Sequence, residues 1–538
     1  KNWTKQQKKE AQDWVNKTYN SLSQDEKLGQ LFIVALYTNK GDEHIEQVRQ
    51  LVKNEQLGGL ILMQDDAQKH SELVNEFQGY SKTPMLIGMD AEWGVYQRIN
   101  TAYKFPWAIT LGAIQDKKLI KKMAAQIAQD AKKIGVNWDF APVVDVNTNP
   151  SNPIIGNRSF GSEVRNVAQS ALAYSIGLQD NKVLAAIKHF PGHGDTNVDS
   201  HHDLPIVSHN LDRLKRVELA PFKALINKGI GGIMVAHLYI PALEQKENTP
   251  ASISYSIVTD LLKNQLKYKG LIITDALNMG AVAKHYKAGE LDALAFKAGN
   301  DIMLFSEGVK EGKKQIQNAI NKGEISQKRV EESVKKILLT KYYLGLNNYQ
   351  PNITKDINQL INTPNHKAIS QELYANAITL LKDKNKLIPF KQNETYFVLP
   401  LEEGNHQEFI HQLNERLNTK TISNLNHIPE HSKIIISLHK DNSTAYKPYT
   451  ISEESKNIIS NLAKKHQVIL CLFGSPYALK DIEIENISSI IVAYENNDDA
   501  MFSAVKALSG DHKIHGKLPV SVNDKIKAGA GLIRKVKK

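Results

Sequence analysis

The sequence predicts an α/β protein with two domains: an N-terminal (β/α)8 TIM-type barrel and a smaller α/β sandwich with a mostly parallel sheet. The first observation behind this is that eight short apolar runs alternate with amphipathic stretches over the first 345 of 538 residues. The second is a renewed alternation after residue 375, in which the strands are continuously apolar, as in sheets covered on both faces. Because periodicity does not prove that a sheet closes, a doubly wound open sheet is the alternative for the first domain.

The barrel strands are predicted where four or five apolar residues are bounded by polar ones. These strands are residues 31–35, 59–63, 85–88, 136–140, 184–188, 232–236, 271–274 and 301–305. Between them, apolar residues recur every three or four positions, which predicts amphipathic helices. The helices are residues 45–52, 119–134, 164–179, 211–226 and 309–320, and a closing helix covers 326–344.

The segment 346–375 loses apolar periodicity and gains Asn, Pro and Thr, which predicts a linker. We therefore expect a barrel domain over 1–345 and a sandwich domain over 376–522. The sandwich strands are predicted at 396–400, 434–438, 468–473 and 489–494, with helices at 409–417, 455–463 and 500–508. Residues 523–538 are expected to form a frayed basic tail.

Composition excludes several classes of protein. A content of 41% hydrophobic and 23% charged residues is typical of a globular chain and not of a disordered or fibrous one. No apolar run approaches the ~18 residues of a transmembrane helix. Lys and Arg exceed Asp and Glu by 11, but they form no groove-like motif, so no nucleic-acid partner is predicted. Cys471, the single cysteine, lies in an apolar run and is expected to be a buried thiol.

Polar side chains follow five of the eight predicted barrel strands, at the point where each strand ends. Barrel enzymes place their chemistry on the loops at these carboxyl ends. A shared polar pocket explains this better than five independent strand ends that reach solvent. The residues concerned are Asp90, Asp145, Lys188 with His189, His237 and Asp275.

The densest group of ionisable residues is KHFPGHGDTNVDSHHDLP, residues 188–205. One interpretation is a metal site, because His and Asp are common zinc ligands, although the loop lacks a familiar ligand spacing such as HExxH. A second pairs Asp199 with His201, which share a side of an extended segment, so that the carboxylate stabilises a protonated imidazole. Such a pair is a proton donor suited to neutral pH. A solvated turn is the third.

Two further elements point to chemistry. Asp275 ends an apolar strand and could be a metal ligand, a hydrogen-bond acceptor or a nucleophile. Asp90 has Trp93 close in sequence, a combination that suits a polar ring-shaped ligand such as a sugar. Simple packing of Trp93 explains its presence equally well.

Together, five segments resemble glycoside hydrolase family 3, and specifically its β-N-acetylglucosaminidases. The segments are KHFPGHGDTNVDSH from 188, IGNRSFG at 155–161, TDALNM at 274–279, PASIS at 250–254 and GKLPVSV at 516–522. The resemblance implies a catalytic nucleophile at Asp275, a general acid/base at His201 and its dyad partner at Asp199. It also implies that Asp90, Arg158, Lys188 and His189 hold the terminal sugar.

As an activity, the resemblance implies a retaining exo-β-N-acetylglucosaminidase that needs no metal and no other cofactor. Its substrate would be a GlcNAc-containing muropeptide or chitooligosaccharide. We expect a monomeric bacterial protein, exported to the periplasm or cell envelope, although a cytoplasmic location fits the sequence too. The family usually has an EGGR pattern after the residue matching Asp90, whereas this chain reads Glu92, Trp93, Gly94, Val95.

Two alternatives follow from the same residues. A β-glucosidase or β-xylosidase of the family would use a glutamate of the second domain as its acid/base, and the Asp-Ser-His sequence at 199–201 argues against it. A non-catalytic sugar-binding protein would keep the pocket and not the reaction. The intact Asp199, His201 and Asp275 argue against this second alternative.

Overall fold

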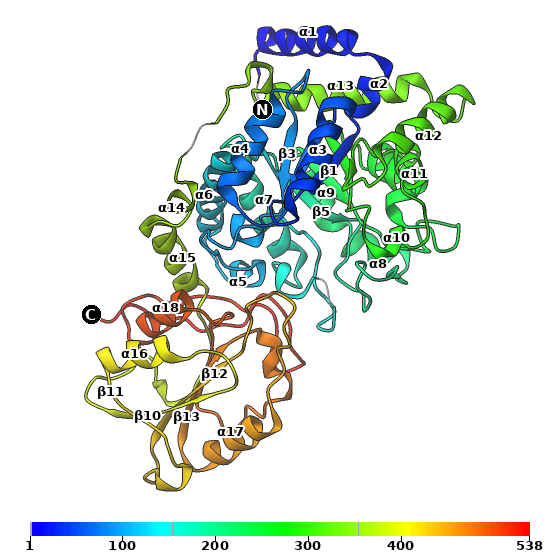
Figure 1. Cartoon of the computed structure of the whole chain (residues 1–538). Coiled ribbons are helices and arrows are strands. Elements are labelled where there is room, and N and C mark those ends of the chain that lie inside the picture. Colours follow the sequence, from blue (N-terminus) through cyan, green and yellow to red (C-terminus); the bar gives the residue numbers. More distant parts are fainter. Residues whose placement is uncertain (1–2, 153–154, 353–354) are drawn as a thin grey trace. The chain divides into compact units, whose positions relative to one another are not determined.

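The computed structural model describes residues 3–152, 155–352 and 355–538 and is drawn in Figure 1. It contains two compact units. The first comprises Lys1–Lys104, Lys121–Ile154 and Ala171–Thr363, and the second comprises Phe105–Ile120, Ile155–Ser170 and Pro364–Lys538. Two stretches from within the predicted barrel range thus belong to the second unit.

The first unit is built around eight parallel strands. They are β1 Phe32–Leu36, β2 Gly59–Leu62, β3 Leu86–Met89, β4 Trp138–Asp139, β5 Ala186–Phe190, β6 Gly232–Val235, β7 Leu271–Thr274 and β8 Met303–Leu304. Hydrogen-bonded pairing runs β4-β3-β2-β1-β8 and β5-β6-β7. Single parallel bridges from Trp138 to Leu184 and from Ile273 to Ile302 join the two groups. The ring is closed, so the barrel is confirmed against the open sheet.

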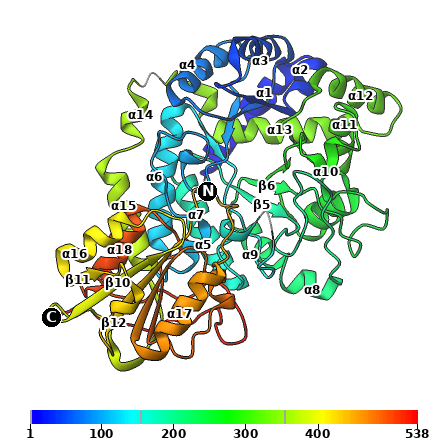
Figure 2. The same ribbon diagram turned by 60° about the horizontal axis from the view of Figure 1, so that its bottom comes forward.

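Helices surround this ring, as Figure 2 shows. Along the described chain up to residue 363, the helices are α1 Lys5–Ser21, α2 Gln24–Gly29, α3 Gly41–Glu55, α4 Ala67–Gln78, α5 Ala108–Gly112, α6 Lys118–Ile134, α7 Val164–Gln179, α8 Leu211–Arg216, α9 Ala220–Ile226, α10 Gly280–Ala283, α11 Glu290–Ala298, α12 Val309–Asn321, α13 Gln327–Tyr343 and α14 Ile357–Leu360. Of these, α5, the start of α6 and the first part of α7 belong to the second unit. A π-helix spans Ser256–Gln265. The predicted single helix 211–226 is two helices, because Pro221 starts the second in its first turn.

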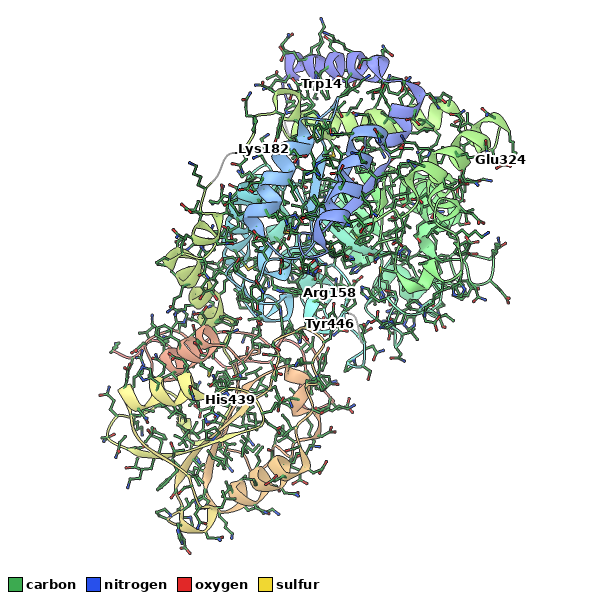
Figure 3. The ribbon with its side chains drawn as sticks, in the orientation of Figure 1. Trp14, Arg158, Lys182, Glu324, His439 and Tyr446 are labelled. Carbon is green, nitrogen blue, oxygen red and sulfur yellow. The ribbon has the colours of Figure 1, made fainter. Side chains whose placement is uncertain are left out.

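Helix α1 packs against α13 through aromatic rings. The Trp14 ring, labelled in Figure 3, lies 5.8 Å from that of Tyr342, and Trp3 meets Tyr342 edge-on at 5.9 Å. Such contacts bury a large apolar area and fix how the two helices meet. Over the three described ranges of the chain, no helix is long and apolar enough to cross a membrane.

The second unit is the predicted α/β sandwich with a mostly parallel sheet. Its sheet has the order β11-β10-β12-β13-β14-β9, and only β9 pairs antiparallel, with β14. The strands are β9 Thr379–Asp383, β10 Thr395–Leu401, β11 Asn418–Thr421, β12 Lys433–His439, β13 Gln467–Phe473 and β14 Ser489–Val492. Helices α15 Pro364–Ala377, α16 Gln407–Arg416 and α18 Asp498–Leu508 cover one face, and α17 Glu453–Lys465 covers the other (Figure 2). The main core of the unit, which includes Cys471, lies under the first three.

Two expectations about the connecting segments differ from the structure. Much of the predicted linker 346–375 is helical, since α14 and the greater part of α15 fall within it, while residues 353 and 354 lie outside the described residues. The C-terminal tail is not frayed. Leu532 N donates to Leu380 O at 2.8 Å, and Arg534 forms an ion pair at 2.9 Å with the buried carboxylate of Asp383. Backbone pairing with β9 orders the tail.

Lys341 on α13 provides a test of how this helix packs against the segments before β1 and β3. Its Nζ is buried and donates to Gln30 Oε1 at 2.6 Å and Thr83 Oγ1 at 2.8 Å, and burial lowers the pKa of Lys341 to about 7. The unfolded chain, with a lysine pKa of about 10.4, therefore binds more protons between these values. Stability should rise with pH across this window.

We predict that Lys341→Met removes this rise, which amounts to at most about 1.4 kcal/mol per pH unit. The measurement is the free energy of unfolding by urea at pH 7 and pH 9, compared with the parent chain. Lys328→Met, on the exposed face of the same helix, is the control and should keep the slope of the parent. An unchanged slope in Lys341→Met would contradict the prediction.

Candidate active site

The polar strand ends of the first unit gather at the carboxyl ends of β3 to β7. Asp90 follows β3, Asp145 lies beyond β4, His237 follows β6 and Asp275 follows β7. Lys188 and His189 lie within β5. A closed ring of parallel strands brings all its carboxyl ends to one rim, which is why residues so far apart in sequence meet.

Lys188 links two carboxylates at this rim. Its Nζ lies 3.2 Å from Asp90 Oδ1 and 3.0 Å from Glu92 Oε2, and its side chain is only 2% exposed. Arg98 Nη2 donates to the other Asp90 oxygen at 2.8 Å. Burial raises the pKa of Asp90, but Lys188 and Arg98 outweigh it, so that the pKa lies below its usual range. Asp90 is therefore an ionised acceptor, suited to bind hydroxyl groups of a ligand.

Asp145 holds the start of the histidine-rich loop. Its Oδ2 accepts from His189 Nδ1 at 2.7 Å, and its Oδ1 accepts from the backbone N–H of His189 at 3.1 Å and of His193 at 2.8 Å. Three donors to one buried carboxylate compensate the cost of removing it from water. The ring of His189 is thereby fixed in one orientation.

Asp275 lies among histidines. Burial raises the pKa of its carboxyl, but the imidazoles of His189 and His237 and the Ala276 N–H lower it, and the net pKa is below the ordinary value. The Ala276 N–H donates to Asp275 Oδ1 at 2.8 Å. His201 acts on the Asp275 pKa in the same direction. An anionic carboxylate at the end of a strand is a competent nucleophile.

His237 and Ser252 support this carboxylate in a way that sequence reasoning missed. Ser252 Oγ lies 2.7 Å from His237 Nδ1, and His237 Nε2 lies 2.9 Å from Ala276 O. Burial lowers the pKa of His237, which favours a neutral ring that accepts from Ser252 and donates to Ala276. In the sequence, His237 stands out because it follows a predicted strand, and Ser252 because it lies in the PASIS segment. Neither pattern indicates that the two side chains contact each other.

The predicted pairing of Asp199 and His201 is present in the structure. Asp199 Oδ1 accepts from His201 Nδ1 and from the His201 backbone N–H, both at 2.8 Å. The side chains are 30% and 51% exposed, respectively. Since Nδ1 donates to the carboxylate, Nε2 is the atom that can exchange a proton with a ligand.

Arg158 belongs to the second unit, where it ends the short helical turn Gly156–Arg158 and is buried. Figure 3 labels it. Its assignment to the sugar site stays a prediction from the sequence. Trp93 is separated by Gly94 from the short helical turn Val95–Gln97.

The described residues of the chain contain no group of three or more His, Cys, Asp or Glu placed to hold a metal ion. Instead, the histidines of the 188–205 loop pair with hydroxyls and carboxylates. His193 meets Thr196 Oγ1 at 3.0 Å and Ser200 Oγ at 3.3 Å, and His209, just beyond the loop, meets Asp195 at 2.5 Å.

His193 offers a direct test of this loop. Burial lowers its pKa to about 4, because a charged ring would be enclosed away from water. We predict that NMR signals of the His193 ring titrate near pH 4 in the folded chain and near about 6.5 in the unfolded chain. A folded-state midpoint above 6 would show that the loop is more open than this arrangement.

The chain resembles known proteins over most of its length. Residues 23–340 match the family described as glycosyl hydrolase family 3 N terminal domain. The chain is 31% identical over 379 residues to Beta-hexosaminidase A of Pseudoalteromonas piscicida, an alignment that covers 64% of this chain and 63% of the relative. It is 28% identical to Beta-N-acetylglucosaminidase/beta-glucosidase of Cellulomonas fimi, with 70% and 67% covered. The chain thus spans less than two thirds of the first relative.

Among solved structures, the chain is similar to a glycoside hydrolase family 3 beta-N-acetylglucosaminidase from Paenibacillus sp. str. FPU-7. The TM-score is 0.76 at 28% sequence identity, and the match covers 94% of this chain and 99% of that one. The likeness extends over both units, whereas the family match covers the barrel.

Proposed function

Because the chain belongs to glycosyl hydrolase family 3, we propose that it is a retaining exo-β-N-acetylglucosaminidase. It removes terminal β-linked GlcNAc from peptidoglycan fragments or chitin-type oligosaccharides. The observation that carries the proposal is the Asp199–His201 pair on the loop after β5, in the same barrel as an Asp275 whose pKa is lowered. The names of the similar proteins support the choice of sugar.

The reaction begins with the Asp275 carboxylate attacking the anomeric carbon. The glycosidic C–O bond breaks, and His201 Nε2 gives its proton to the departing oxygen. A covalent glycosyl-enzyme results. His201, now neutral, takes a proton from water as that water attacks the same carbon, which regenerates both side chains and retains the configuration.

The roles differ from the common scheme of retaining glycosidases, in which two carboxylates act as nucleophile and acid/base. A protonated imidazole donates its proton and becomes neutral, whereas a carboxylic acid becomes a second anion. A neutral base is an advantage when the substrate itself is anionic, as muropeptides are. The net charge of +11 is compatible with such a substrate.

In the same proposal, Asp90 accepts hydrogen bonds from the hydroxyls of the terminal sugar. Lys188, which is ion-paired with Asp90, and His189 are proposed to hold the same sugar, and the family resemblance assigns Arg158 to the same task. The alignment of these groups before the reaction supplies the orientation on which the rate depends. We further propose a monomeric bacterial protein that acts in the periplasm or cell envelope, in line with the bacterial relatives.

A β-glucosidase is the second candidate, since the Cellulomonas fimi relative carries both activities in its name. The discriminating experiment compares hydrolysis of p-nitrophenyl β-GlcNAc with the corresponding β-glucoside and β-xyloside. We expect a clear preference for β-GlcNAc. A preference for either of the others would remove the proposed specificity.

We predict that Asp275→Ala abolishes turnover and leaves the fold intact, because the change deletes the attacking carboxylate and no core group. A mechanism-based 2-deoxy-2-fluoro glycoside should label one residue of the parent chain. The measurement is mass spectrometry of the labelled peptides. A label on any residue other than Asp275 would refute the assignment.

A second prediction concerns the leaving group. His201→Ala should slow hydrolysis of chitobiose by roughly 10²-fold or more, because a sugar alkoxide is a poor leaving group. The burst with a dinitrophenyl glycoside, which leaves as a stable anion, should change little. Azide should partly restore steady-state turnover, because it replaces the water that needs a base.

Asp199→Asn should show the same pattern in weaker form. The change removes the negative charge that supports the protonated imidazole, while the asparagine side chain keeps the shape of the aspartate. Pre-steady-state bursts with both substrates are the measurement. If His201→Ala lowers both burst rates equally and azide has no effect, His201 serves only to position the sugar.

A further inference from the structure

The segment that carries His201 rests on the first turn of α10. Gly280 N donates to His201 O at 2.9 Å, and Ala281 N donates to Ser200 O at 3.1 Å. Lys284 Nζ donates to His202 O. Since α10 begins five residues after Asp275, these bonds attach the loop of the proposed proton donor to the segment that follows the proposed nucleophile.

Gly280 leaves no space for a side chain at this contact. A Cβ built on Gly280 would lie 2.6 Å from His201 O and 2.9 Å from His202 O. Both distances are below those that real Cβ atoms show, and both partners are backbone atoms, which cannot turn aside as a flexible side chain can. The backbone of Gly280 is not in the left-handed region, so the steric contact, and not backbone strain, is the reason for glycine here.

The bonds within the loop do not replace this attachment. Asp199 Oδ1 accepts both the ring and backbone N–H of His201, so this pair orders the loop internally and does not tie it to the barrel. His193 Nε2 lies 3.3 Å from Ser200 Oγ, which is a second contact of this segment and does not involve α10. With the His201 ring half exposed, the position of the ring relative to Asp275 depends on where the loop backbone rests.

We propose that Gly280 is a positioning residue: its lack of a side chain lets the Ser200–His202 backbone rest on α10, which sets the distance from His201 to Asp275. The proposal depends on the proton-transfer role proposed above for His201. We call Gly280, Ala281 and Lys284 the seat of the loop, because each of them donates a hydrogen bond to its backbone. Neither Gly280 nor Lys284 is assigned to contact the sugar or the reacting atoms.

The test is Gly280→Ala, measured with the two leaving groups used for His201→Ala. Alanine is a good helix former, so its effect should come from the displaced loop. We expect turnover of chitobiose to fall on the order of 10²-fold, mainly in kcat, while the dinitrophenyl burst stays within a few fold of the parent. Azide should partly restore steady-state turnover of the dinitrophenyl substrate.

Two further variants serve as a control and as an independent test of the Gly280→Ala result. Gly79→Ala, at the end of α4, is the matched control because Gly79 lies outside the seat. A Cβ added at Gly79 would have Glu76 O as its nearest neighbour, at 3.1 Å. It should leave both rates unchanged. Lys284→Met adds no atom between loop and helix, and it should give the same leaving-group pattern as Gly280→Ala, only milder. If Gly280→Ala does not fold, the leaving-group pattern of Lys284→Met alone tests whether the contact between the loop and α10 positions His201.

The outcomes separate this inference from the proposed function. Chitobiose turnover in Gly280→Ala within a few fold of the parent, or equal losses for both substrates without azide rescue, would overturn the positioning role while leaving that of His201 untouched. If His201→Ala itself shows no dependence on the leaving group, the proton-transfer role proposed for His201 and the role of Gly280 both fall.

Discussion

Closure of the eight-stranded ring is the constraint on which the site depends. An open sheet would leave the carboxyl ends of its outer strands far apart, whereas the bridges from Trp138 to Leu184 and from Ile273 to Ile302 complete a ring. Side chains after β3, β5 and β7 then converge on one rim. The histidine-rich loop after β5 adds Asp199 and His201 to the groups at this rim. These side chains can act together with Asp275 only if contacts with the barrel hold the loop in place.

Burial alone does not decide the charge of the carboxyls in this barrel. Burial raises the pKa of both Asp90 and Asp275, which are partly buried, yet cationic or imidazole neighbours hold the pKa of each below its usual value. For Asp139, burial prevails, and its pKa is raised well above the ordinary value although it accepts the Ala91 N–H. The pKa values of carboxyls of one chemical type are thus shifted in opposite directions, according to the donors and charges that surround them.

The sequence predicts the parts of the fold and site that depend on local pattern. Apolar runs identified the barrel strands and four of the six sandwich strands, but β11 is largely exposed and carries no such run. The Asp199–His201 pair could be predicted because its members are two residues apart. The contact of Ser252 with His237 and that of Gly280 with His201 could not, since each depends on how separate loops meet in space.

The ordered C-terminal tail also covers one edge of the sandwich sheet. A strand at the border of a sheet presents unpaired backbone groups that can recruit a strand from another molecule. Here β9 lies at one border, and Leu532 pairs with Leu380 there while Arg534 neutralises the buried Asp383. The other border, β11, is short and bears Lys420 on its exposed surface. The basic C-terminal residues thus act as an intramolecular cover that guards the sandwich against edge-to-edge aggregation.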